Sequence, residues 1–91
     1  MQLEPVKGKK LSTTNQTYVS SSAVRSIDYS MSSETLELEF INNQVYHYYN
    51  VPKQVWEKTM DVVKTGKSLG TFVNEQIKNL DVDYRKIITV M

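Results

Sequence analysis

The clearest pattern in the chain is a strict alternation of apolar and acidic side chains over residues 35–41. The apolar positions are Leu36, Leu38 and Phe40, and the acidic positions between them are Glu37 and Glu39. Such alternation predicts a strand with one face in the core and the other facing water. Asn42 and Asn43 then form a two-residue turn that tolerates positive φ. The aromatic run QVYHYYNV that follows predicts the second strand of a hairpin.

An earlier strand is predicted within AVRSIDYS. Its apolar residues Val24, Ile27 and Tyr29 favour a strand, but they are too unevenly spaced for simple alternation. We therefore expect a twist or a bulge in this strand. The polar segment 30–34 connects it to the alternating strand.

Two helices are predicted after the hairpin. Pro52 suits the first helical residue, because the N–H that it lacks has no partner there, and Gly66 lies just past the expected end. Between them, apolar residues form a broad stripe, and charged residues pair at helical spacing. Ser68 is a good N-cap for a second helix, which we expect to end near Asp81.

Both ends of the chain lie outside this pattern. Residues 1–18 are polar and contain Pro5 and Gly8, so we expect them to form a surface arm. The tail, residues 81–91, carries the β-prone run YRKIITVM, whose apolar residues are Ile87, Ile88 and Val90. The tail can add an edge strand to the sheet or pair with a second copy of the chain.

The predicted order of elements is β-β-β-α-α, with the tail as an additional edge strand. This order predicts an α+β domain over residues 19–80. A small antiparallel sheet of three or four strands is expected, with two helices packed on one face.

Composition narrows the classes of function. A chain of 91 residues is one domain, and its net charge of +1 argues against a general basic surface for phosphates. The absence of cysteine and the single histidine, His47, exclude disulfides, thiol chemistry and the common zinc sites, so we expect neither a metal nor a cofactor. No apolar run is long enough to span a membrane or act as a secretion signal, and a cytoplasmic protein is expected.

Three segments, in order, resemble the KTSC domain, a short module named after the C-terminal domain of some lysyl-tRNA synthetases. They are VSSSAVRSIDY, YHYYNVP and SLGTFVNEQI. The middle segment resembles the family's Tyr-x-Tyr feature followed by Val-Pro, and the last segment resembles its Ser-x-Gly, aromatic, Asn and Ile pattern. The matching residues are Tyr46, Tyr48, Val51, Pro52, Ser68, Gly70, Phe72, Asn74 and Ile77. The resemblance implies a family without an assigned function that is a candidate for RNA binding, with free-standing members in bacteria and phages.

Tyr46 and Tyr48 are two residues apart on a strand and therefore share a face. They form either a platform on which bases stack or a pair of core residues whose hydroxyls reach the rim of the sheet. If the apolar residues of the neighbouring strand face the helices, Glu37 and Glu39 lie on the open face and repel phosphates. This favours the core interpretation and places any RNA surface on loops and helix ends.

Ser68, Gly70 and Asn74, with Lys67 beside them, form the start of the second helix. Free backbone N–H groups and the positive end of the helix dipole can bind a phosphate or a carboxylate there. The alternative is a simple N-cap, with Gly70 allowing the second helix to pack closely on the first.

Ser21 and Ser22 beside Arg25 are a second candidate anion site, although an ordinary polar start to a strand explains them equally well. His47 is out of phase with the two tyrosines and is expected to be exposed on the opposite face of the sheet. Since a catalytic site needs a positioned base and nucleophile, we do not expect an enzyme.

The sequence therefore predicts a small non-enzymatic module that binds RNA or a nucleotide through the start of its second helix, residues 68–74, together with Arg25 and Lys67. The alternative is a structural or protein-interaction module that forms a homo-oligomer through its tail strand. A combination of the two is a free-standing oligomer that sequesters a small nucleotide-like ligand, as a phage counter-defence protein would.

Overall fold

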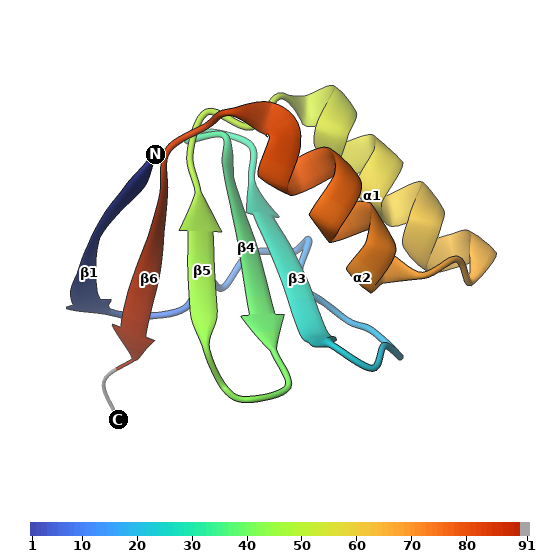
Figure 1. The fold of residues 1–91 in the computed structure, drawn as a ribbon, viewed down its shortest axis with the longest axis horizontal. Coiled ribbons are helices and arrows are strands. Elements are labelled where there is room, and N and C mark those ends of the chain that lie inside the picture. Colours follow the sequence, from blue (N-terminus) through green and yellow to red (C-terminus); the bar gives the residue numbers. More distant parts are fainter. Residues whose placement is uncertain (90–91) are drawn as a thin grey trace.

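The computed structural model describes residues 1–89, which form one sheet with helices on one face (Figure 1). The strands are β1 (Gln2–Gly8), β2 (Thr17–Tyr18), β3 (Val24–Ser30), β4 (Thr35–Phe40), β5 (Val45–Tyr48) and β6 (Tyr84–Thr89). The helical elements are α1 (Lys53–Thr65), α2 (Leu69–Phe72), the π-helical turn η1 (Val73–Ile77) and the 3₁₀ turn η2 (Lys78–Leu80). The α+β class is confirmed, but the sheet has six strands, in the order β1-β6-β5-β4-β3-β2, instead of three or four.

The two ends of the chain supply the additional strands. β6 pairs antiparallel with β5 and parallel with β1, so the sheet is mixed and not purely antiparallel. The prediction of an edge strand in the tail is wrong, because both sides of β6 are paired and the edges of the sheet are β1 and β2. Val90, the last apolar residue of the predicted tail strand, lies outside the described residues.

The central strands β3, β4 and β5 form the predicted antiparallel meander. The uneven apolar spacing in β3 does mark a bulge, since the register with β4 shifts between Val24 and Ser26. The turn between β4 and β5 is longer than predicted: the Phe40 N–H donates to the Gln44 carbonyl (2.9 Å), and Asn43 adopts φ 67°. A left-handed residue before the second strand is typical of such longer hairpin loops, and asparagine tolerates that conformation.

Pro52 and Gly66 bound α1 much as their chemistry predicts. The helix runs from Lys53 to Thr65, so Pro52 is its N-cap and not its first residue, and Gly66 caps its C-terminal end with a φ of 71°, which suits glycine. The predicted pair between Lys53 and Glu57 forms on the exposed surface (3.9 Å), where it contributes little to stability. Among residues 1–89, no helix is long and apolar enough to cross a membrane.

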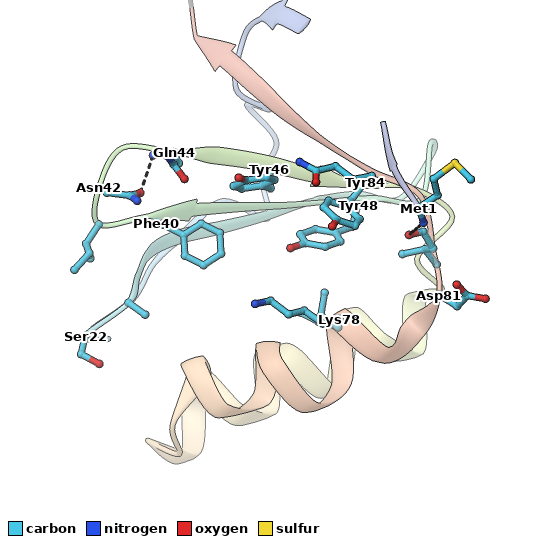
Figure 2. Close-up of a pocket in the computed structure, with 15 residues that line it drawn as sticks. Met1, Ser22, Phe40, Asn42, Gln44, Tyr46, Tyr48, Lys78, Asp81 and Tyr84 are labelled. Carbon is cyan, nitrogen blue, oxygen red and sulfur yellow. Dashed lines mark hydrogen bonds between the residues drawn. The ribbon is translucent and has the colours of Figure 1, made fainter. Parts of the chain in front are cut away.

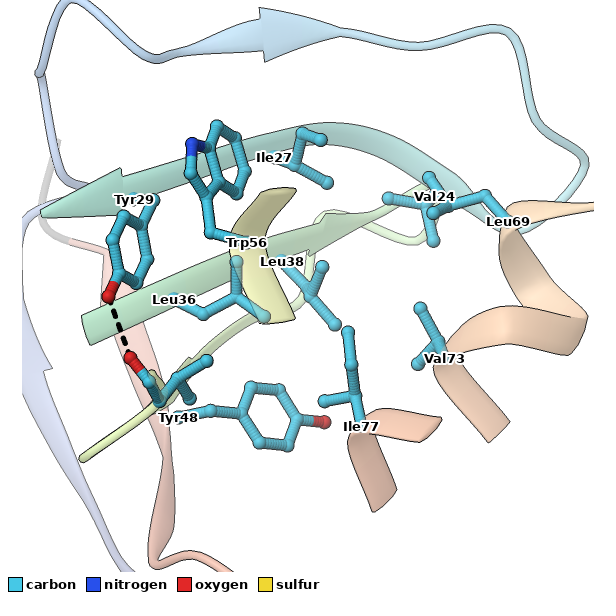
Figure 3. Packing of buried hydrophobic residues seen from close by; sticks show 11 residues of the cluster. Val24, Ile27, Tyr29, Leu36, Leu38, Tyr48, Trp56, Leu69, Val73 and Ile77 are labelled. Carbon is cyan, nitrogen blue, oxygen red and sulfur yellow. Dashed lines mark hydrogen bonds between the residues drawn. The ribbon is translucent and has the colours of Figure 1, made fainter. Parts of the chain in front are cut away.

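The core lies between the helices and strands β3 to β5 (Figure 3). The rings of Tyr29 and Trp56 stack there, with centroids 5.4 Å apart and planes 9° apart. The Tyr29 hydroxyl donates to the Val51 carbonyl (2.7 Å). This hydrogen bond satisfies a polar atom inside the core and ties β3 to the loop that precedes α1.

The segment 9–16, here called the crossing segment, must pass across the sheet because β1 and β2 lie at opposite edges. It lies on the face opposite the helices, which bears Asp28, Glu37 and Glu39. Carboxylates of that face hold it in place. The Leu11 N–H donates to Glu37 (2.6 Å), the Lys10 ammonium to Glu39 (2.8 Å) and the Thr13 N–H to Asp28 (3.1 Å). The predicted surface arm is therefore part of the sheet and covers its acidic face, leaving Asp28 and Glu37 buried.

His47 lies on the face opposite Tyr46, as predicted, but it is not exposed. It pairs in register with Glu37, and its Nε2 atom lies 2.7 Å from the Glu37 carboxylate. The crossing segment contributes the neighbouring Leu11 N–H to the same carboxylate. The prediction of an exposed histidine is wrong because the N-terminal residues cover a face that the central strands alone would leave open.

Replacing Tyr29 with phenylalanine removes the hydroxyl and leaves the buried Val51 carbonyl without its partner. We expect the free energy of unfolding to fall by about 1–3 kcal/mol, measured by urea denaturation. Tyr18→Phe is the matched control, because Tyr18 is 72% exposed and its hydroxyl makes no hydrogen bond within residues 1–89. Equal stability of the two variants would contradict a structural role for the Tyr29 hydroxyl.

The surroundings of the Glu39 carboxylate make its contribution to the free energy of unfolding depend on pH. Partial burial by itself raises the pKa of Glu39, but the hydrogen bond and charge of Lys10, together with Ser26 and Arg25, outweigh it and hold the pKa below its ordinary value of 4.5. The ionised form is thus favoured by folding. Its stabilisation is present above the ordinary pKa and is lost as the pH falls through the lower pKa of the folded state.

We therefore expect Glu39→Gln to be less stable than the wild type at neutral pH, with a difference that shrinks as the pH falls below 4.5. Urea denaturation of both proteins across this range measures the difference. Lys10→Met should reduce the same pH dependence, because it removes the main partner of Glu39. A difference between wild type and Glu39→Gln that stays constant with pH would rule out this ion pair as its source.

Candidate functional site

The helices cover only part of the apolar face of the sheet, and an open cleft lies beside them (Figure 2). The cleft has a volume of about 770 Å³ and is bounded by β4, β5 and β6 on one side and by η1 and η2 on the other. This volume is within the range of sites that bind small organic molecules. We call this feature the aromatic cleft, after the side chains of its sheet side.

Phe40, Tyr46, Tyr48 and Tyr84 form the sheet side of the aromatic cleft. Phe40 meets Tyr46 edge to face at 5.9 Å, and Tyr46 lies 6.4 Å from Tyr84. Tyr48 and Tyr84 stack at 5.4 Å. The rings support one another and form a continuous aromatic surface whose shape is fixed by their mutual packing.

The two predicted tyrosines do share a face, but they differ in burial. Tyr46 pairs in register with Leu38, and Tyr48 pairs with Leu36, so both side chains lie on the face that the helices pack against. Tyr48 is 5% exposed and joins the core, whereas Tyr46 is only half-buried beside the cleft. Tyr48 therefore fits the interpretation as a core residue, whereas Tyr46 is placed as the interpretation as a stacking platform requires.

The expected repulsion of phosphates by Glu37 and Glu39 does not apply to the face of the sheet that bears Tyr46. Glu37 and Glu39 lie on the opposite face of the sheet, beneath the crossing segment. The face that bears Tyr46 remains open because the helices are too few to cover a sheet of this width. An aromatic surface and the acidic side chains of β4 are thus separated by the sheet itself.

Lysines lie on the cleft side of the sheet. Lys78 of η2 lines the cleft opposite the tyrosines. Lys86 is the register partner of Tyr46, and Lys7 is the partner of Ile88, so both lie on the same face of the sheet as the tyrosines. The one acidic residue that lines the cleft is Asp81. This arrangement combines aromatic rings with cations, which suits a ligand that has both a planar ring and a phosphate.

The Tyr48 hydroxyl is held in its neutral form. Burial raises the pKa of Tyr48 to about 12, with smaller contributions from Tyr84 and Tyr46. The group therefore keeps its proton at neutral pH and remains able to donate a hydrogen bond.

The predicted anion site at the start of the second helix lies at the opposite end of that helix from the cleft. The Ser68 hydroxyl accepts from the Thr71 N–H (3.2 Å) and thus caps α2. Lys67 and Ser68 line a shallow depression of about 340 Å³, which Gly70 and Asn74 do not line. The structure therefore brings together only two of the four residues predicted for this site.

Gly70 has a different neighbour from the one predicted. A side chain at this position would meet Ala23, at 3.8 Å, before any atom of α1. This is an ordinary van der Waals distance to the residue just before β3, so the predicted close packing of the second helix on the first at this glycine is wrong.

The three residues of the second predicted anion site also have separate roles in the structure. The Ser21 hydroxyl accepts from the N–H groups of Ala23 and Val24, which is the ordinary polar start of a strand. Arg25 donates to Asn43 and to the Ile41 carbonyl and so clamps the turn between β4 and β5. Of the three predicted residues, only Ser22 lines the aromatic cleft.

Sequence reasoning missed Tyr84, Lys78 and Phe40 as residues of a site. Tyr84 belongs to a tail treated as separate from the domain, and Phe40 is indistinguishable from a core residue by alternation alone. The available signal was the shared aromatic character of Tyr84 and the Tyr46–Tyr48 pair. Within residues 1–89, there is no group of three or more side chains placed to hold a metal ion.

Comparisons with known proteins identify the family of this chain. The chain matches the family model of the KTSC domain over residues 20–84. It is also similar to the crystal structure of a KTSC domain protein from Yersinia pestis, with 33% sequence identity and a TM-score of 0.70 over 80% of this chain and 96% of that chain. No curated protein matches the chain. The protein belongs to the KTSC domain family.

Proposed function

We propose that this protein is a small non-enzymatic module that binds single-stranded RNA through the aromatic cleft. The single observation that carries the proposal is the aromatic surface of Phe40, Tyr46 and Tyr84, left open on the half of the sheet that the helices do not cover. Proteins that recognise unpaired RNA bases commonly stack them on aromatic side chains of a sheet.

Charge supports the same proposal. Lys78, Lys86 and Lys7 lie on the cleft side of the sheet, where they can contact the phosphates that flank a stacked base. With a net charge of +1, the protein has no general basic surface, so these lysines would act locally. We expect modest affinity that depends on a few phosphate contacts, unlike the steep salt dependence of highly basic proteins.

His47 and the carboxylates of β4 support a non-enzymatic module. These titratable side chains lie together on the central sheet, but they hold the crossing segment on the face away from the cleft. This places them out of reach of a ligand in the cleft and gives them a structural role.

The strand order argues against one alternative function, the homo-oligomer, and leaves the other, a protein that sequesters a nucleotide, compatible with the same cleft. A homo-oligomer built through the tail strand would need a free edge on β6, and both sides of that strand are paired. A protein that sequesters a free nucleotide would use the same base and phosphate chemistry as the proposed RNA site. Free nucleoside monophosphates are therefore included as competitors in the binding experiments.

Replacing Tyr46 with leucine keeps an apolar side chain but removes the stacking surface. The loss of one stacked base should weaken the binding free energy for a fluorescently labelled single-stranded RNA by about 1–3 kcal/mol. This corresponds to an affinity that is roughly fivefold lower or more, which fluorescence anisotropy measures. Tyr18→Leu is the control, because Tyr18 is an exposed tyrosine of β2 at one edge of the sheet and does not line the cleft. Equal affinity of Tyr46→Leu and wild type would contradict the proposed site.

A pair of charge reversals separates the aromatic cleft from the helix start. Lys78→Glu should weaken RNA binding and reduce the slope of log affinity against log salt by roughly 0.7 for a lost phosphate contact. Lys67→Glu is its matched control at the other end of the same helical region and should leave affinity and slope unchanged. The reverse result would place the site at Ser68, as the sequence alone predicted, and would exclude the cleft.

A further inference from the structure

The hydroxyl of Tyr48 is the polar group that the core presents to the aromatic cleft. The Tyr48 side chain is 5% exposed, yet its hydroxyl makes no hydrogen bond to any atom of residues 1–89. Tyr29, the other tyrosine of the core, donates its hydroxyl to the Val51 carbonyl. Unlike the hydroxyl of Tyr29, the hydroxyl of Tyr48 lines an open cleft, and it is not among the buried side-chain atoms that lack a partner within residues 1–89. It is therefore free to form a hydrogen bond with whatever occupies the cleft.

The surroundings of Tyr48 aim this hydroxyl into the aromatic cleft. Its ring stacks on Tyr84, with planes 24° apart, which fixes the direction of the C–O bond. The hydroxyl faces the helical side of the cleft near Ile77 and Lys78 (Figures 2 and 3). A ligand that enters the cleft therefore meets a preoriented polar group at the inner end of an otherwise aromatic surface.

We propose that the Tyr48 hydroxyl is the specificity group of the cleft and donates a hydrogen bond to the edge of an unpaired nucleobase that lies against the aromatic surface. This inference rests on the proposed function and names the contact that selects among bases. Stacking alone tolerates every base, because each has a π-face, whereas a directional hydrogen bond distinguishes bases by the acceptors on their edges. The raised pKa of Tyr48 keeps the proton on this hydroxyl throughout the physiological range.

The test is the substitution Tyr48→Phe, which keeps the ring and its stack on Tyr84. Stability distinguishes a structural hydroxyl from a binding one. Because the hydroxyl has no internal partner, we expect Tyr48→Phe to melt at the same temperature as the wild type or higher. Tyr29→Phe, which loses an internal hydrogen bond, should melt lower. A fall in melting temperature as large as that of Tyr29→Phe would overturn the inference.

Binding supplies the second measurement. Labelled single-stranded oligomers of adenylate, uridylate and cytidylate, with the four free nucleoside monophosphates as competitors, define the base preference of the wild type. Tyr48→Phe should lower the affinity for the preferred base by roughly three- to tenfold, the loss of one hydrogen bond. The weakest-bound base should change least, so that the preference becomes flatter.

The outcomes separate this inference from the proposed function. If the wild type binds the oligomers and Tyr48→Phe binds them with the same base preference, the specificity role is wrong and the RNA site stands. If the wild type binds none of the oligomers or monophosphates, the proposed function fails and the inference fails with it. If only the free monophosphates bind, the hydroxyl is tested on them in the same way, and the ligand is a nucleotide instead of an RNA strand.

Discussion

The fold depends on the buried carboxylates that hold the crossing segment against the sheet. β1 and β2 lie at opposite edges, so the chain must pass over an entire face between them. Asp28, Glu37 and Glu39 accept hydrogen bonds from that passing segment, and His47 pairs with Glu37 beside it. A buried carboxylate without such partners would be strongly destabilising. The N-terminal residues and the acidic face of the sheet therefore require each other, and the placement of β1 beside β6 follows from the same crossing.

The width of the sheet in turn creates the candidate site. The helices lie over the β3 side of the sheet, and the added strands β6 and β1 extend the apolar face beyond their reach (Figure 1). The uncovered part carries aromatic side chains, Tyr46 and Tyr84 among them. Tyrosine suits this intermediate position, because its ring packs against the core while its hydroxyl tolerates water.

Stability and binding make different demands on the tyrosines. Tyr29 satisfies its hydroxyl within the protein and adds to the core. Tyr48 also belongs to the core but directs its hydroxyl at the cleft, so that this group is not used within the protein. The same residue type thus has a structural role on β3 and, in our proposal, a recognition role on β5. The difference arises from what lies opposite each ring, a backbone carbonyl in one case and an open cleft in the other.

Local chemistry determined much of this protein in advance. Alternation in β4, the bulge in β3, the hairpin, the proline and glycine that bound α1 and the Ser68 cap all follow from short-range preferences of the residues involved. The family resemblance likewise rests on short motifs. Only the tertiary structure decided that β6 lies inside the sheet between β1 and β5, that His47 and Glu37 are buried, and that Tyr46 and Tyr84 line one cleft. These features depend on pairing between the two ends of the chain, and no local periodicity specifies which strand a distant segment will join.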